Sequence, residues 1–380
     1  MSDLPKLVPG LADVPAAESS VSFIDGKRAR LEYRGIAVEL LARESTYEEV
    51  SYLLLKGELP TQRELARYDA DLRVHRRLKY KIIDMLRCLP ENGHPMSALQ
   101  AAVSALGMFY PGRSITDPKT NWESVTRLIA KIPTIVAAFH RLRHGDEALP
   151  PRDDLGHSAN FYWMLMEKEP SPAVTRVMDA CLTLHAEHSM NASTFSARVT
   201  GSTLADPYTV ISSAVGTLSG PLHGGANEEV LDMLDEIGSA ENATHWLQDA
   251  IAHKKKIMGM GHRVYKVKDP RATVLQELAE NVFAENGRPA RYDMALAVER
   301  AAVPLLGPKG IHPNVDFFSG IVYESLGIPR DLFTPIFAIA RVSGWLAHWL
   351  EQIKNNRIYR PEQIYVGKND VAYVPLEQRP

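Results

Sequence analysis

The chain has 380 residues, of which 45% are hydrophobic and 23% are charged, the composition of an ordinary globular protein of one or two domains. Lys and Arg number 43 and Asp and Glu number 46, so the formal net charge is −3. This balance argues against a general nucleic-acid-binding protein, which needs a basic surface. The best basic cluster, His253-Lys254-Lys255-Lys256, is short.

No segment predicts a secretion signal or a membrane span. The first residues, MSDLPKLVPGLADVP, lack a basic region followed by an apolar core. No apolar run reaches the ~20 residues that cross a bilayer. Cys88 and Cys181 lie in apolar helical patterns, which predict two buried thiols and no disulfide framework. We therefore expect a cytoplasmic protein without a membrane partner.

The first predicted element is a short β-hairpin over residues 21–35, VSFIDGKRARLEYRG, which alternates around a glycine-containing turn. Beyond it the patterns predict helices. In residues 46–60, Thr46 stands three residues before Glu49 as in a capping box, and Gly57 and Pro60 mark the end. Residues 94–112 predict a helix that begins at Pro95 and ends at Gly112.

Two later segments are also predicted to be helical. Residues 171–188 carry apolar residues at helical spacing and end in HAEH, so we expect His185 and His188 on one helix face. Residues 334–353 have Thr334 as the expected N-cap and Pro335 at the first helical position. No repeat of 20 to 50 residues is visible. The sequence predicts an all-α fold with a minor β-hairpin near the N-terminus.

Two glycine-containing stretches divide the predicted helices. They are the zone 216–225 and the turn Gly327-Ile328-Pro329. We expect a large helical domain made of residues 1–220 and 332–380, with a small helical domain, residues 221–331, inserted into it. A site between two such domains suits a cleft that closes.

Three residues beside glycine or proline are candidates for chemistry. His223 lies in SGPLHGGANEE, His262 in GMGHRVYKVKDPR, and Asp316 in HPNVDFFSG. A histidine set between such residues points at a ligand or merely occupies a turn, and the stretch alone leaves both open. A carboxylate at a helix start can simply favour the helix dipole.

A metal site is one interpretation, because HxxH with a further histidine and an aspartate supplies zinc ligands. The H-E-x-x-H pattern is absent, however, and the carboxylate of HAEH stands between the histidines. The sequence therefore argues against a metal site. GMG before His262 also lacks the strand–GxGxxG–helix context of a dinucleotide site.

Three arginines support another interpretation. Arg271 follows Asp269-Pro270, Arg360 lies in NNRIYRP, and Arg341 interrupts the apolar segment AIARVSGW. Surface charges and structural ion pairs are the ordinary roles of arginine, but a guanidinium in so apolar a helix needs an anionic partner. Guanidinium groups hold carboxylates. Together with His223, His262 and Asp316, these arginines therefore indicate a site for a small anionic acid that uses proton transfer without an obligatory metal.

Seven blocks, in order from about residue 23 to 366, make the chain resemble the citrate synthases of the shorter, prokaryotic kind: FIDGKRARLEYRG, YLLLKGELP, HAEHSMNASTFSARV, GPLHGGANEEV, KIMGMGHRVYKVKDPRA, PNVDFFSG and NNRIYRP. The resemblance implies that Asp316 takes a proton from the methyl group of acetyl-CoA. His223 would then stabilise the enol or enolate, and His262 would polarise the ketone of oxaloacetate. His188, Arg271 and Arg341 match ligands of oxaloacetate and citrate, as does Arg360 from a second subunit. His185 matches no catalytic position and is expected to be structural.

The resemblance also implies a two-domain helical fold and a homodimer or higher homo-oligomer. Acetyl-CoA is the implied co-substrate, with no permanently bound cofactor. Its CoA adenine would lie against the loop 256–261, which includes Gly259, Met260 and Gly261, and Lys256 and Lys309 are candidates for the phosphates.

Two alternatives to citrate synthase remain open. One is a 2-methylcitrate synthase that uses propionyl-CoA, because one extra methylene changes pocket energies by only ~1 to 3 kcal/mol. The other, from a different class, is a non-catalytic helical assembly protein of the same fold. The joint presence of His223, His262 and Asp316 counts against it.

Overall fold

The computed structural model describes residues 7–110, 115–262 and 264–380. In this part of the chain there are sixteen α-helices and one small antiparallel sheet, which confirms the predicted all-α class. None of the helices in these ranges is both long and apolar enough to cross a bilayer.

The sheet has three strands in the order β1 (Ser22–Asp25), β2 (Arg30–Tyr33) and β3 (Ile36–Ala37). It confirms the predicted hairpin and adds a short third strand. The tip of the hairpin is fixed at Gly26, where an added Cβ would lie 2.0 Å from the carbonyl oxygen of Val264. The Gly26 carbonyl also accepts the Lys266 amide at 3.0 Å. The hairpin therefore holds the loop that follows His262.

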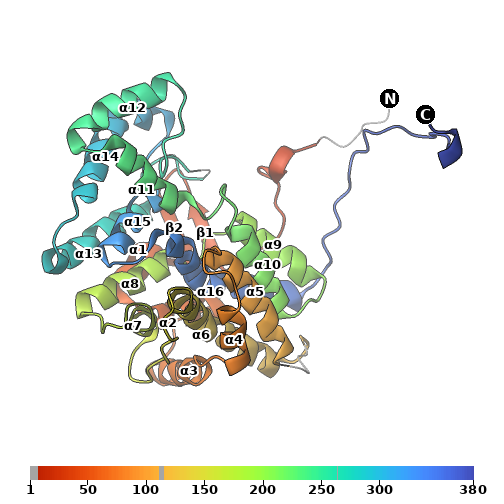
Figure 1. Ribbon diagram of the computed structural model, residues 1–380, viewed down its shortest axis with the longest axis horizontal. Helices are drawn as coiled ribbons and strands as arrows, with labels where there is room; N and C mark the ends of the chain where they lie inside the picture. Colours follow the sequence, from red (N-terminus) through yellow and green to blue (C-terminus); the bar gives the residue numbers. More distant parts are fainter. Residues whose placement is uncertain (1–6, 111–114, 263) are drawn as a thin grey trace.

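Eleven helices form the lower part of the molecule in Figure 1. They are α1 (Val38–Glu44), α2 (Tyr47–Lys56), α3 (Gln62–His75), α4 (Tyr80–Arg87), α5 (Pro95–Met108), α6 (Pro118–Arg143), α7 (His157–Met166), α8 (Pro172–His185), α9 (Ala192–Ser202), α10 (Pro207–Leu218) and α16 (Phe333–Lys354). Helix α16 packs against α2, α6, α8, α9 and α10, and its Trp345 and Trp349 are fully buried. It is the centre of the core.

The other helices lie above this group in Figure 1, except for α13, which lies at its left edge near α8. They are α11 (Ala226–Ile237), α12 (Ala243–Ala252), α13 (Pro270–Asn286), α14 (Ala290–Leu306) and α15 (Asp316–Ser325). Helix α12 packs on α14, and α11 packs on α15. Helix α13 packs on α15 and also on α8 and α1, so it joins the two groups.

Several predicted helix ends are confirmed. Thr46 and Glu49 form the capping box of α2, and Gly57 ends that helix in the left-handed region at φ 99°. Helix α5 begins at Pro95 as expected but ends at Met108, before the predicted end. Gly112 lies outside the described residues.

The predicted start of α16 and the predicted burial of Cys88 are wrong. Thr334 is not an N-cap and Pro335 is not the first helical residue, because α16 begins at Phe333 and continues the 3-10 turn Arg330–Leu332. Its hydroxyl lies instead 2.6 Å from Glu228 Oε1 in α11 and 3.3 Å from the Gly224 carbonyl. Cys88 is exposed, because it follows the last turn of the short surface helix α4, whereas Cys181 is buried as expected.

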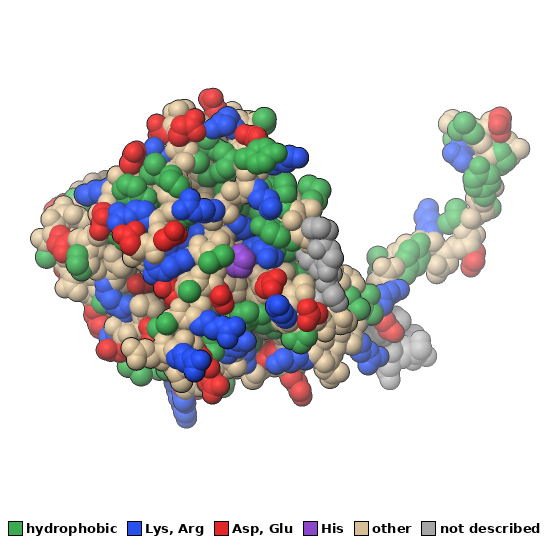
Figure 2. Space-filling model, turned by 90° about the horizontal axis from the view of Figure 1, so that it is seen from below, with side chains coloured by type: hydrophobic (Ala, Val, Ile, Leu, Met, Phe, Trp, Pro, Cys, Tyr) green, Lys and Arg blue, Asp and Glu red, His purple; other side chains and the backbone are tan. Residues whose placement is uncertain are grey.

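Residues after α16 leave the body as an extended tail, at the right of Figures 1 and 2. Its apolar side chains are largely exposed in the single chain: Ile358 60%, Tyr365 60%, Val366 92%, Val371 69%, Tyr373 81% and Leu376 71%. A run of apolar side chains this exposed is typical of a segment that contacts another protein surface.

Candidate active site

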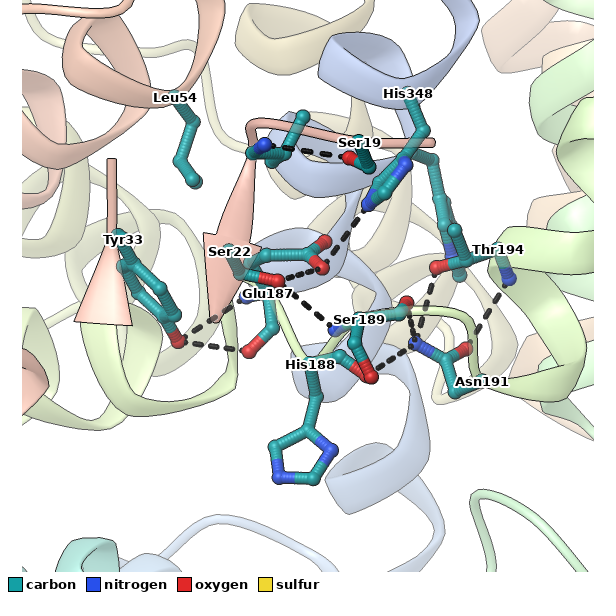
Figure 3. Close-up of polar contacts among 12 residues, drawn as sticks. Ser19, Ser22, Tyr33, Leu54, Glu187, His188, Ser189, Asn191, Thr194 and His348 are labelled. Carbon is teal, nitrogen blue, oxygen red and sulfur yellow. Dashed lines mark hydrogen bonds and ion pairs between the residues drawn. The ribbon is translucent and has the colours of Figure 1, made fainter. Parts of the chain in front are cut away.

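The end of helix α8 decides where His188 lies. The hydroxyl of Tyr33 lies 2.9 Å from the carbonyl oxygen of Glu187 and accepts the amide of the same residue at 3.2 Å (Figure 3). These contacts satisfy backbone groups that would otherwise need a further helical turn. Helix α8 therefore stops at His185, and the prediction that His185 and His188 share a helix face is wrong.

The side chain of Glu187, a residue of this turn, is a fully buried carboxylate. It accepts hydrogen bonds from Ser22 Oγ at 3.0 Å and from His348 Nε2 at 3.1 Å, while the His188 ring points away from the group (Figure 3). Burial alone would raise the pKa of Glu187, but His348 and Arg341 hold it below its usual value. The carboxylate of Glu187 therefore remains ionised although it is buried.

Two buried guanidinium groups meet the carboxyl end of α8. Arg341 Nε donates to the carbonyl oxygen of His185 at 2.7 Å, and Arg271 Nη1 lies 3.5 Å from that of Leu184. The free carbonyls at a helix C-terminus attract cations. Arg271 also forms a fork with Asp269, at 3.0 Å and 2.7 Å.

The two arginines differ in how their charge is balanced. Burial would lower the pKa of Arg271, but Asp269 raises it above its usual value. No carboxylate forms a salt bridge with Arg341 in the described part of the chain, and burial lowers its pKa to about 10. Its guanidinium lies 4.7 Å from the centre of the Phe337 ring. A buried cation without a bonded anion suits an anionic ligand.

His262 and His188 lie together beside these arginines. Their ring centres are 5.0 Å apart, and Tyr265 contacts both rings. His262 Nδ1 accepts the amides of Val264 and Tyr265, at 3.0 Å and 3.2 Å. Burial, followed by Arg271, lowers the pKa of His262 to about 4. The neutral ring therefore carries its proton on Nε2, which is free to donate to a ligand.

His223 has the opposite tautomer. Its Nε2 accepts the amide of Ser193 at 3.2 Å and lies 2.8 Å from Ser193 Oγ, which Trp345 Nε1 contacts at 3.0 Å. Burial, followed by Arg341, lowers the pKa of His223 to about 4. The neutral ring therefore has Nδ1–H as its donor. Two neutral histidines thus offer one N–H each.

Asp316 is the first residue of α15, as predicted. Its amide donates to Asn314 Oδ1 at 3.0 Å, so the loop before it forms the helix start. Its Oδ1 is buried without a hydrogen-bond partner in the described chain. Burial raises the pKa of Asp316 to about 6, although Arg271 and Arg341 oppose this. Such a carboxylate is a stronger base than an exposed one.

The loop 256–261 is bonded to the segment that leads to Asp316. The Gly261 amide donates to the His312 carbonyl at 2.8 Å, and the Asn314 amide donates to the Gly259 carbonyl at 2.9 Å. Gly259 has φ 69°, and a Cβ there would lie 2.9 Å from Phe317 Cα. Glycine is therefore required at this position for the loop to approach the start of α15.

Three predicted residues are not drawn into this group. Lys256 and Lys309 are exposed. Arg360 lies in the exposed tail, where its guanidinium donates to the Pro361 carbonyl at 2.9 Å and, among the described residues, to no other group. Among residues 7–110, 115–262 and 264–380, no three His, Cys, Asp or Glu side chains are grouped so that they could hold a metal ion.

Sequence reasoning missed the residues that orient the histidines and arginines. Ser193 and Trp345 fix His223, and Asp269 fixes Arg271. Asp269 stands two residues before the candidate Arg271 in DPR, and that spacing could have identified it. Ser193 gave no signal, because its contact with His223 spans 30 residues of sequence.

Comparisons with known proteins identify the family of the chain. The family described as "Citrate synthase, C-terminal domain" matches residues 10–362. A citrate synthase of Synechocystis sp. is 58% identical over 100% of this chain and 96% of its own length, and one of Acidithiobacillus ferridurans is 49% identical over 99% of each.

Solved structures agree with the sequence relatives. The citrate synthase of Pyrobaculum aerophilum superposes with a TM-score of 0.94 at 44% identity, covering 98% of this chain and 95% of that one. That of Thermoplasma acidophilum, in a ternary complex with carboxymethyl coenzyme A and oxaloacetate, gives 0.92 at 33% identity, with coverage of 98% and 100%.

The fold and the comparisons thus define an enzyme of the acyltransferase class. The chain belongs to the citrate synthase family.

Proposed function

We propose that this protein condenses acetyl-CoA with oxaloacetate and water to give citrate and CoA. The observation that carries the proposal is the arrangement at the end of α8. There, the neutral ring of His262 and the carboxylate of Asp316, with its raised pKa, accompany two buried guanidiniums. The neutral ring of His223 is held at the start of α9, and the charge of Arg341 contributes to its lowered pKa. This is the set of groups needed to make and trap an enolate of a weak carbon acid beside an anionic ketone.

The proposed steps assign one task to each residue. Asp316 takes a proton from the acetyl methyl group while His223 Nδ1–H donates to the thioester oxygen and stabilises the enol or enolate. His262 Nε2–H donates to the ketone oxygen of oxaloacetate as the new carbon–carbon bond forms. Water then hydrolyses the citryl thioester, which releases CoA. The low pKa values of both histidines support roles as neutral donors.

The ligands of oxaloacetate are proposed to be His188, Arg271 and Arg341, with Arg360 from a neighbouring subunit. Arg341 supports this assignment most strongly, because it has no protein carboxylate bonded to it. His188 Nε2 is likewise buried without a hydrogen-bond partner in the described chain.

Acetyl-CoA is proposed to bind against the loop 256–261, with Gly259, Met260 and Gly261 next to the adenine and Lys256 and Lys309 near the phosphates. No permanently bound cofactor is needed for the steps above. The support is the bonding of this loop to the segment before α15, because it would hold the bound CoA next to the helix whose Asp316 the acetyl group must reach.

We also propose the division into a large domain, residues 1–220 and 332–380, and a small domain, residues 221–331, that closes over oxaloacetate. Closure keeps water from the thioester until condensation. Small-angle scattering of the apo protein and of the protein with oxaloacetate tests this. A smaller radius of gyration is expected with oxaloacetate, and an unchanged radius would contradict closure.

A homodimer is proposed as the smallest active form. The exposed apolar side chains of the tail support it, since they would be covered by a second copy. No membrane or nucleic acid is proposed as a partner, because the net charge of −3 provides no basic surface for them.

Release of the CoA thiol tests the function. The wild type is expected to release CoA from acetyl-CoA only when oxaloacetate is present, and Asp316→Asn is expected to lose about 10²- to 10⁴-fold in kcat. Calorimetry should show that the variant still binds oxaloacetate. A variant that retains a tenth of the wild-type kcat would overturn the role of Asp316.

The same assay separates the alternatives. A higher kcat/KM for propionyl-CoA than for acetyl-CoA would make the protein a 2-methylcitrate synthase. No thiol release with either substrate would leave the non-catalytic assembly protein.

A further inference from the structure

His185 is a buried histidine next to Asp316 that the steps above do not use. Its ring packs edge-on against Phe337, with centres 4.9 Å apart at an interplanar angle of 71°. Its Nδ1 lies 2.8 Å from the carbonyl oxygen of Cys181. Because a carbonyl only accepts, Nδ1 carries the proton. Burial lowers the pKa of His185 to about 3, so the ring is neutral and Nε2 has a free lone pair.

That lone pair faces the carboxylate. His185 Nε2 lies 3.9 Å from Asp316 Oδ1, and each atom is buried without a hydrogen-bond partner in the described residues. Two acceptors that face each other give no hydrogen bond to the ionised carboxylate. A buried polar atom left without a partner is costly, so its presence in two adjacent groups calls for a functional reason.

We propose that His185 is a positioning residue that turns an unprotonated nitrogen towards Asp316 Oδ1, withholds any hydrogen-bond donor from it, and so keeps Asp316 a strong base. This inference rests on the proposed function, in which Asp316 takes the methyl proton. Its physical basis is that a hydrogen bond to a carboxylate stabilises the ionised form and weakens the base. The ring cannot present Nδ1–H instead without losing the Cys181 contact.

His185 also connects the base to the substrate ligands. Its backbone carbonyl accepts Arg341 Nε, while its ring faces Asp316. The other titratable groups that act on Asp316 come from the start of α13, from α16 and from α15 itself: Arg271, Asp269, Arg341 and Tyr323. Burial and Asp269 raise the pKa of Asp316, whereas Arg271 and Arg341 favour the ionised carboxylate. The proposed role of His185 is to add no hydrogen bond to the side that favours ionisation.

Replacement of His185 by a donor and by a non-donor tests the idea. In His185→Gln the amide N–H can reach Oδ1, so the acid limb of kcat/KM should move down by about one pH unit. At neutral pH kcat should fall, and the isotope effect with methyl-deuterated acetyl-CoA should rise. His185→Phe brings no donor, so its acid limb should stay at the wild-type pH. Oxaloacetate affinity should be unchanged in both.

A merely structural role predicts another pattern, in which both variants lose activity or stability and neither moves the acid limb. His157→Gln is the matched control, because His157 is also buried with an unpartnered Nε2 but lies at the start of α7. It should leave the pH profile unchanged. An acid limb at the wild-type pH in His185→Gln would overturn the proposal.

A measurement on the unmodified protein covers the case in which His185→Gln does not fold. Nitrogen-15 NMR of histidine-labelled protein should show His185 as the neutral Nδ1–H tautomer, assigned by loss of its signals in His185→Phe. A proton on Nε2 would overturn the proposal. Asp316→Asn, measured alongside, separates the proposed function from the role of His185. If Asp316→Asn keeps its activity, the proposed function fails. If only the His185 results disagree, the role of His185 alone fails.

Discussion

The two regions that carry the proposed substrate arginines are built in opposite ways. At the end of α8, Arg271 and Arg341 are 4% and 1% exposed and are held by carbonyls, an aspartate and a ring. In the C-terminal tail, Arg360 is exposed, and within the described part of the chain its guanidinium bonds to the next residue alone. The first region is held by contacts within one chain, whereas we propose that the second is ordered by a neighbouring subunit.

The contrast suggests where each region obtains its order. Buried charges must be paired or desolvated by their own fold, so their positions are fixed when the core forms. An exposed tail gains its order from what it contacts. We therefore expect the active site to combine a rigid part from one subunit with an arm from another.

The largest expected effect is the return of activity when two inactive variants are mixed, which tests whether the tail serves another subunit. Asp316→Asn chains and Arg360→Leu chains should each be nearly inactive alone. If Arg360 serves the neighbouring site, a mixed dimer has one site with both changes and one with neither, so activity should return. The measurement is CoA release after subunit exchange, with exchange checked independently. A mixture that exchanges but stays inactive would place Arg360 in its own site or in none.

Replacing each buried arginine in turn tests whether Arg271 and Arg341 contribute differently to stability. Arg271→Leu leaves Asp269 buried without its partner, which should destabilise the apo protein by about 3–5 kcal/mol. Arg341→Leu removes a cation that has no bonded carboxylate, so its thermal midpoint should change much less. Both should lose oxaloacetate binding. Adding Asp269→Asn to Arg271→Leu should restore part of the stability, and equal losses in the two single variants would refute the difference.

The pH dependence of kcat/KM tests whether burial sets the chemistry of the first region. Asp316 must be ionised to take a proton, and its raised pKa of about 6 means that the base is lost as the pH falls through that value. His223 and His262, with pKa values of about 4, stay neutral over this range. We expect one acid limb near pH 6. A limb near pH 4 would show that Asp316 is not the desolvated base.

The two cysteines give the smallest expected effect, on thiol reactivity alone. Cys88 is exposed, whereas Cys181 lies in the buried helix α8 and burial raises its pKa to about 12. A thiol reagent should therefore modify Cys88 quickly and Cys181 slowly in the native protein. Cys88→Ser should abolish the fast reaction and keep full activity. Fast modification of both thiols would contradict the packing around the end of α8.

The parts of the fold that depend on local sequence could be predicted. The hairpin, the capping box at Thr46 and the start of α5 at Pro95 follow from residues a few positions apart. The end of α8 could not, because the Tyr33 hydroxyl that satisfies Glu187 lies 154 positions away. The start of α16 depends in the same way on Glu228, 106 positions from Thr334.

The candidate site shows the same limit. Glycine and proline around His223 and His262, and the isolated charge of Arg341, made these residues visible in the sequence. What each imidazole bonds was not visible, and those bonds decide which nitrogen can donate. His185 was expected to be structural from the resemblance alone, and only its distance to Asp316 gives it a further proposed role.

The most direct test of the central claim follows the methyl carbon. Wild-type protein is supplied with acetyl-CoA labelled with carbon-13 in the methyl group and with unlabelled oxaloacetate, and the product is observed by NMR. The account predicts citrate labelled in one methylene carbon, formed about 10²- to 10⁴-fold more slowly by Asp316→Asn at the same protein concentration. Labelled acetate and free CoA without any citrate would contradict it.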